Sequence, residues 1–115
     1  QVGENESTGN VDENFEWDAV TETWIEREPL TIARGHAASS SRAIGCGFIM
    51  AGGSTNNGKT ADISFYNLLT DTWTSLGELP SAINTPVCDV HKDYLNCESG
   101  LVRGSFSWRR QITVE

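Results

Sequence analysis

One eight-residue pattern occurs twice in this sequence, and the spacing of its two copies constrains the fold more than any other feature. WDAVTETW runs from Trp17 to Trp24, and YNLLTDTW runs from Tyr66 to Trp73. Each copy begins with an aromatic residue and ends with a Trp, and the copies lie 49 positions apart. A turn-rich repeat of this period with short apolar segments is typical of β-propeller blades, whereas helical repeats are shorter. The sequence therefore predicts an all-β chain.

The residues around the two copies follow a recurring order. An aromatic strand end precedes a Thr-rich turn and a Trp, followed by a Pro-Leu or Leu-Pro pair, an Arg/His stretch and an apolar strand that ends in Gly-Gly. After the second copy the order is only partly kept, because AINTPVCDV (82–90) lacks the Arg and His. The complete copy comprises RGHAASSS (34–41), FIMAGG (48–53), ISFYN (63–67) and DTW (71–73). From about Asn14 to Trp108, the chain resembles the Kelch repeat. The resemblance implies Kelch-type β-propeller blades, each a four-stranded antiparallel sheet.

The resemblance divides the chain into four parts. Residues 1–13 form an acidic, polar N-terminal stretch whose composition predicts a flexible tail. Residues 14–33 supply the end of one blade, its outer strands near 14–18 and 22–27, and a link. Residues 34–82 supply a complete blade. Residues 83–115 supply a partial and divergent blade, with Ser99-Gly100 in place of Gly-Gly and strands expected near 83–90, 94–99, 104–109 and 111–115.

Four residues are expected to shape and pack these blades. Gly52 and Gly53 end a buried strand where the backbone must turn sharply without a Cβ atom. Trp24 and Trp73 are large apolar wedges that we expect to fill the space between neighbouring blades.

About two and a half blades make an incomplete ring, because a propeller needs roughly four to eight blades to close. The end blades would then expose apolar surface that neighbours have to cover. We expect those partners to be further blades of a longer protein, of which this chain is a fragment, or other copies of the chain.

Two of the three cysteines, Cys88 and Cys97, flank a predicted hairpin in the last blade. A two-residue loop at Lys92-Asp93 places Cys88 opposite Cys97 at a non-hydrogen-bonded pair, where side chains approach most closely. This arrangement suits a disulfide. The alternative is two small buried thiols in a cytosolic protein.

A disulfide indicates an oxidising compartment. The triplet Asn5-Glu6-Ser7 is an N-glycosylation acceptor and agrees with this interpretation. The expected location is therefore extracellular or the lumen of the secretory pathway.

Charge and motifs exclude several function classes. The net charge of −8 argues against nucleic acid, whose affinity depends on Lys and Arg. No apolar run reaches the roughly 20 residues that span a bilayer, so we expect no membrane insertion. His36 and His91 fall on different blades, so we expect no metal site and no cofactor. The triple serine at 39–41 lacks a nucleophile-elbow pattern, and no catalytic residue is assigned.

The residues favour a binding role over an enzymatic one. One face of the blades carries the loop Ser54–Asp62, the links 28–33 and 78–83, and the loop 100–103. Its candidate binding residues are Thr55, Asn56, Asn57, Lys59 and Arg103. Such loops carry recognition on rigid scaffolds, and the alternative is that they only connect strands.

We therefore expect a non-enzymatic binding or structural module that recognises protein or glycan through this face. One alternative is a segment of a carbohydrate-active or copper-radical enzyme similar to galactose oxidase, with its catalytic residues elsewhere, since Tyr66 and Tyr94 occupy plain strand positions. The other is a cytosolic Kelch adaptor.

Overall fold

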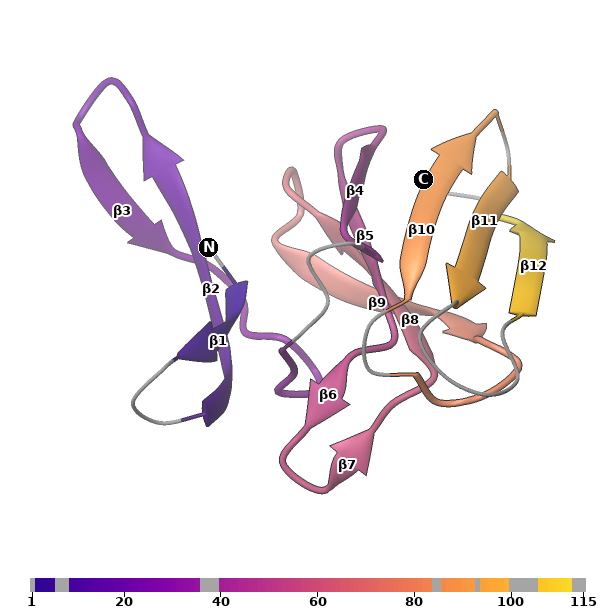
Figure 1. Cartoon of the computed structure of the whole chain (residues 1–115). Helices are drawn as coiled ribbons and strands as arrows, with labels where there is room; N and C mark the ends of the chain where they lie inside the picture. The colour runs from indigo at the N-terminus through magenta and orange to yellow at the C-terminus, as the bar shows by residue number, and fades with distance from the viewer. Residues whose placement is uncertain are drawn as a thin grey trace.

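The chain folds into small antiparallel β-sheets, and the prediction of an all-β fold is confirmed (Figure 1). The computed structural model describes residues 2–5, 9–35, 40–83, 86–92, 94–99 and 106–112, and no helix occurs among them. The N-terminal sheet contains β1 (Val2–Asn5), β2 (Gly9–Asp18) and β3 (Thr23–Glu26). The central sheet contains β4 (Arg42–Ile44), β5 (Gly47–Ala51), β8 (Asp62–Asn67) and β9 (Thr72–Glu78). A hairpin of β6 (Ser54–Thr55) and β7 (Gly58–Lys59) lies between β5 and β8 in the chain. The C-terminal sheet contains β10 (Val87–His91), β11 (Tyr94–Ser99) and β12 (Phe106–Gln111).

The central sheet has the four antiparallel strands that were expected of a complete blade, in the order β4-β5-β8-β9. Its first strand lies later in the chain than predicted. We expected residues 34–41 in this position, but β4 begins at Arg42, and Gly35 forms only an isolated bridge with Ser54. The turn at Gly45-Cys46 explains the difference, because it pairs Ile44 with Gly47 and so fixes which residues lie opposite β5. Residues 36–39 lie outside the described residues.

The two middle strands of the central sheet, β5 and β8, are buried on both faces, because successive side chains of a strand point to opposite sides. Ile49 and Phe65 belong to a cluster that extends to Cys97 and Leu95 of the C-terminal sheet. Met50, on the other face of β5, packs with Leu30 from the segment that follows the N-terminal sheet. In Figure 1 the central sheet lies between the N-terminal sheet and the C-terminal sheet.

The two copies of the sequence pattern form two hairpins with the same local geometry. Trp17 pairs with Trp24 across β2–β3, as Tyr66 pairs with Trp73 across β8–β9. In each turn a side-chain oxygen, of Asp18 or Asn67, accepts hydrogen bonds from the backbone N–H groups two and three residues later. The residue that closes each turn has a positive φ, 55° at Glu22 and 54° at Asp71.

The equivalence extends past the hairpins into the segments that follow them. Leu30 donates its N–H to the carbonyl of Asp12, and Leu79 donates to the carbonyl of Ala61. Leu79 and Ala61 lie 49 positions after Leu30 and Asp12, so the two hydrogen bonds are equivalent in the two copies. Both leucines are buried, so each segment is fixed where it leaves its sheet.

Two further regions differ from expectation. Residues 1–13 were expected to form a flexible tail, but they contain β1 and the beginning of β2, which pair from Val2 with Asn14 to Asn5 with Gly9 and shift register between Val2 and Glu4. A polar sequence forms strands here because the ladder satisfies backbone groups whatever the side chains are. At the C-terminal end we expected strands near 104–109 and 111–115, but β12 is a single strand that ends at Gln111, and residues 113–115 lie outside the described part.

Gly52 lies where the chain leaves β5, with a φ of 67°, and Gly53 follows with a φ of 113°. L side chains rarely adopt such backbone angles. A Cβ atom on Gly52 would also approach the carbonyl oxygen of Ile83 to 2.7 Å. The geometry explains why the strand ends in a pair of glycines.

Candidate functional site

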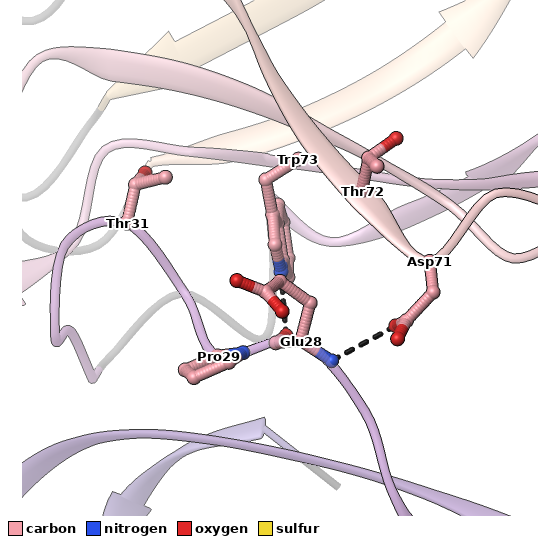
Figure 2. A pocket seen from close by; sticks show the side chains of 6 residues that line it. All are labelled: Glu28, Pro29, Thr31, Asp71, Thr72 and Trp73. Atoms are coloured by element: carbon pink, nitrogen blue, oxygen red, sulfur yellow. Dashed lines mark hydrogen bonds between the residues drawn. The ribbon is translucent and has the colours of Figure 1, made fainter.

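The most specific contact between separate parts of the chain holds Glu28, in the segment after the N-terminal sheet (Figure 2). Its backbone N–H donates to Oδ1 of Asp71 at 2.8 Å, and its carbonyl accepts from the indole N–H of Trp73 at 2.9 Å. Both backbone groups of one residue are therefore fixed by side chains of the central sheet. We call Tyr66, Asp71 and Trp73 the link clamp.

The clamp is assembled by the β8–β9 hairpin. The same Oδ1 atom of Asp71 accepts a hydrogen bond of 2.6 Å from the hydroxyl of Tyr66. The backbone N–H of Glu28 and the Tyr66 hydroxyl hold the pKa of Asp71 below its ordinary value. Burial raises the pKa of Tyr66, and its hydrogen bond to the negatively charged Asp71 raises it further.

A cavity of about 370 Å³ lies beside the clamp. It is lined by Glu28, Pro29, Thr31, Asp71, Thr72 and Trp73. Figure 2 shows that the Asp71 carboxylate and the Trp73 indole reach toward the backbone of Glu28. The cavity is therefore a space between the segment that contains Glu28 and Pro29 and the start of β9, and the polar groups of Asp71 and Trp73 beside it are already hydrogen-bonded to Glu28.

A second candidate site is the β6–β7 hairpin, whose base is fixed by hydrogen bonds to two other segments. Gly35 and Ser54 exchange both backbone hydrogen bonds, each 2.8 Å long. Ile83 accepts from the N–H of Gly53 at 2.7 Å and donates to Thr60 at 3.3 Å. The base of the hairpin is therefore formed by the hairpin itself together with Gly35 and Ile83 from two other parts of the chain.

The tip of this hairpin carries four of the predicted binding residues. Asn56, Asn57 and Lys59 are exposed, and Thr55 is half-buried. The Thr55 hydroxyl accepts a hydrogen bond of 3.2 Å from the backbone N–H of Asn57, which braces the turn. The fifth predicted residue, Arg103, lies outside the described residues.

The two links start at opposite ends of the central sheet. The link that ends at Ile83 lies against the base of the β6–β7 hairpin, on the face where we expected it. Glu28 instead contacts Asp71, in the turn at the other end of β9. Only the start of the link 28–33 departs from the expected loop face, because the chain returns to that face at Gly35, which bridges Ser54 at the base of the hairpin.

The C-terminal sheet contains the predicted disulfide between Cys88 and Cys97. The register is the predicted one, with His91 opposite Tyr94 and Cys88 opposite Cys97, and the two cysteine Cα atoms are 4.1 Å apart. The third cysteine, Cys46, forms no disulfide and is half-buried. Of the predicted glycosylation triplet, Asn5 ends β1 and the other two residues lie outside the described part.

Of the predicted packing residues, Trp73 lies against Phe48 in an edge-to-face arrangement, with ring centroids 5.5 Å apart. Trp24 instead is 56% exposed and contacts Trp17 at 5.2 Å. The two tryptophans therefore occupy equivalent strand positions but different surroundings.

The buried ion pair of Arg34 and Asp62 was not predicted from the sequence. Arg34 is fully buried and forms an ion pair of 2.6 Å with Asp62. It also donates to the carbonyls of Gly52 and Asp62 and to the hydroxyl of Ser64. The Arg/His stretch of the repeat was noted in the sequence, but a buried role was not assigned to its arginine.

Neither a known protein family nor a curated protein matches this chain. Within the described ranges, no three His, Cys, Asp or Glu side chains converge as a metal site would require. His91 is exposed at the end of β10, and His36 is outside those ranges. The same ranges contain no helix of the length and apolarity needed to cross a bilayer.

Proposed function

We propose that this chain is a non-enzymatic binding module of a Kelch-type β-propeller and that it recognises protein or glycan through the β6–β7 hairpin. One observation carries the proposal. The hairpin has a hydrogen-bonded base, to which Gly35 and Ile83 contribute, and an exposed polar tip. A rigid base lowers the entropy lost when a loop binds a ligand.

The chemistry of the tip suits a polar ligand. The side chains of Asn56 and Asn57 each offer donors and an acceptor, and Lys59 offers a cation. These groups match hydroxyl-rich sugars and the polar backbone of an extended peptide.

Two observations support the propeller part of the proposal. The β2–β3 and β8–β9 hairpins share the same pairing and the same turn hydrogen bonds at a constant spacing. The middle strands of the central sheet are also buried on both faces, as those of an internal blade of a ring would be. The remaining blades are, in this proposal, supplied by the same protein or by other copies.

The disulfide supports a location outside the cytosol. Disulfides persist in the extracellular space and the secretory lumen and are rare where thiols are kept reduced. We therefore place the module in the extracellular space or the secretory lumen.

The test is a binding screen of the whole chain against an array of defined oligosaccharides and a panel of recombinant secreted proteins. A triple variant, Thr55→Ala/Asn56→Ala/Lys59→Ala, removes three of the four polar side chains of the tip. The matched control, Val20→Ser/Leu69→Ser, changes two highly exposed residues in the β2–β3 and β8–β9 turns.

We expect at least one saturable ligand, a loss of affinity of about tenfold or more in the triple variant, and unchanged affinity in the control. A chain that binds nothing on either panel would contradict the proposal. A ligand that the triple variant retains would contradict the assignment to the hairpin.

A further inference from the structure

The N-terminal hairpin presents an aromatic pair that the equivalent hairpin of the central sheet keeps covered. Tyr66 is 1% exposed and Trp73 is half-buried. At the corresponding positions of β2 and β3, Trp17 is 49% exposed and Trp24 is 56% exposed. An exposed pair of large aromatic side chains is unusual enough to indicate a contact surface.

The chain itself shows what covers such a pair. On the central sheet Phe48 of β5 lies 5.5 Å from both rings, and the segment that contains Glu28 and Pro29 is hydrogen-bonded to Trp73. That segment contributes its backbone, with one N–H for a carboxylate and one carbonyl for an indole N–H. The groups that are held are therefore the backbone N–H and carbonyl of one residue, and neither hydrogen bond uses the Glu28 side chain. Pro29 follows this residue and lines the same cavity as Trp73.

The N-terminal hairpin carries matching groups at matching positions. Trp24 is equivalent to Trp73 and has the same indole donor, and its ring lies 5.2 Å from that of Trp17, against 5.0 Å between Trp73 and Tyr66. Glu22 is equivalent to Asp71, shares its positive φ and is exposed. Trp17 replaces Tyr66 and lacks the hydroxyl that supports Asp71, while Glu22 has a side chain longer by one methylene.

We infer that Trp17, Glu22 and Trp24, here called the tryptophan platform, form a docking site for an extended, proline-containing peptide segment from outside these two strands. Glu22 accepts the N–H of one residue of that segment, Trp24 donates to the carbonyl of the same residue, and the following proline lies against the indole rings. Proline suits this position because its fixed φ keeps the segment extended and its ring packs on aromatic faces.

The platform is independent of the β6–β7 hairpin. The β2–β3 turn and the β6–β7 tip belong to different sheets and share no strand. Failure of one proposal therefore leaves the other standing.

The experiment titrates the whole chain with a capped synthetic peptide, IEREPLTI, which reproduces residues 25–32 of the sequence. Binding is followed through the indole N–H resonances of the four tryptophans by two-dimensional NMR, which detects millimolar affinities. The Trp24 resonance is assigned by its disappearance in Trp24→Phe. A second peptide carries an N-methyl group on the residue that corresponds to Glu28, so that it lacks the N–H that Glu22 accepts.

We expect saturable movement of the Trp24 resonance, and about tenfold weaker binding both in Trp24→Phe, followed through the amide resonances of β2 and β3, and with the N-methyl peptide. The matched control Val20→Ser changes the exposed tip of the same hairpin and should bind as the parent chain does. The proposal is overturned if no resonance saturates, or if Trp24→Phe binds the peptide unchanged.

A third outcome would also overturn it. If the chain without peptide forms a dimer by sedimentation, and Trp24→Ala abolishes that dimer while the peptide does not compete, then the platform pairs face to face with a second copy. In that case a peptide segment is the wrong ligand, although the tryptophan platform is still a contact surface.

Discussion

The indole N–H of Trp73 donates a hydrogen bond of 2.9 Å to the backbone carbonyl of Glu28, 45 residues earlier in the chain. Together with the Asp71 carboxylate, this bond ties the segment that leaves the N-terminal sheet to the central sheet. The two sheets are therefore attached in part by the side chains of Asp71 and Trp73, which form hydrogen bonds with the backbone of Glu28.

Trp73→Phe should lower the free energy of unfolding by about 1–2 kcal/mol, because it removes one hydrogen bond worth about 1 kcal/mol and part of the ring contact with Phe48. Trp24→Phe is the matched control, since Trp24 is exposed and surface changes usually stay within about 0.5 kcal/mol. Urea unfolding followed by circular dichroism measures both. Equal losses in the two variants would contradict the clamp.

The lowered pKa of Asp71 predicts that the clamp weakens in acid. A carboxyl group whose pKa is lower when folded contributes stability that is present above its unfolded pKa, about 3.9 for Asp, and is lost as the pH falls through the folded value. Asp71→Asn keeps an oxygen that accepts from Glu28 and Tyr66 but does not titrate. Its stability should therefore change less between pH 5 and pH 2 than that of the parent.

Asp18→Asn is the control for this experiment. The pKa of Asp18 is also lowered, by the backbone N–H groups of Val20 and Thr21, but Asp18 holds only its own turn. The indole N–H resonance of Trp73 reports its bond to Glu28, and between pH 5 and pH 2 it should move in Asp18→Asn as it does in the parent. If Asp71→Asn and the parent have the same pH dependence, the carboxylate does not carry the effect.

The disulfide should stabilise the C-terminal sheet by about 2–3 kcal/mol, the chain-entropy value for a short loop of roughly ten residues. Denatured protein should react with one iodoacetamide without reductant, at Cys46, and with three after reduction, as counted by intact mass. The double variant Cys88→Ala/Cys97→Ala should unfold at lower urea than Cys46→Ala, which keeps the bond. Three reactive thiols without reductant would show that the bond is absent.

The sequence predicted those features that depend on local rules. The register that joins Cys88 to Cys97 follows from counting back along a hairpin from a two-residue loop. The similarity of the two aromatic hairpins follows from a pattern that fixes strand, turn and strand within eight residues. Both involve residues close together in the chain, where backbone geometry leaves few alternatives.

Contacts between distant residues were not predictable in this way. The bond between Glu28 and Asp71 joins two loops whose separation depends on how the sheets pack, and no spacing in the sequence encodes it. Residues 2–5 form a strand because a partner strand lies beside them, although their composition predicts a flexible tail. The burial of Arg34 likewise depends on Asp62, which follows it by 28 positions.

The pair of Arg34 and Asp62 yields the sharpest stability prediction. Asp62→Asn leaves the Arg34 charge fully buried without its carboxylate, and removing one partner of a buried pair costs about 3–5 kcal/mol. Arg34→Met removes the charge and should cost less, because Asp62 is partly exposed and still accepts from Ser75. The double variant Arg34→Met/Asp62→Asn should therefore be more stable than Asp62→Asn alone, which is a measurable coupling between the two sites.

Glu16→Gln, which weakens the half-exposed pair of Arg27 and Glu16, is the matched control and should change stability by less than about 1 kcal/mol. All four variants are compared by urea unfolding at neutral pH. If Asp62→Asn were as mild as Glu16→Gln, the guanidinium would have to reach water or another partner, and the buried pair would not hold the end of β5 against β8. If the double variant lost the sum of its two single losses, the two residues would act independently despite the 2.6 Å contact.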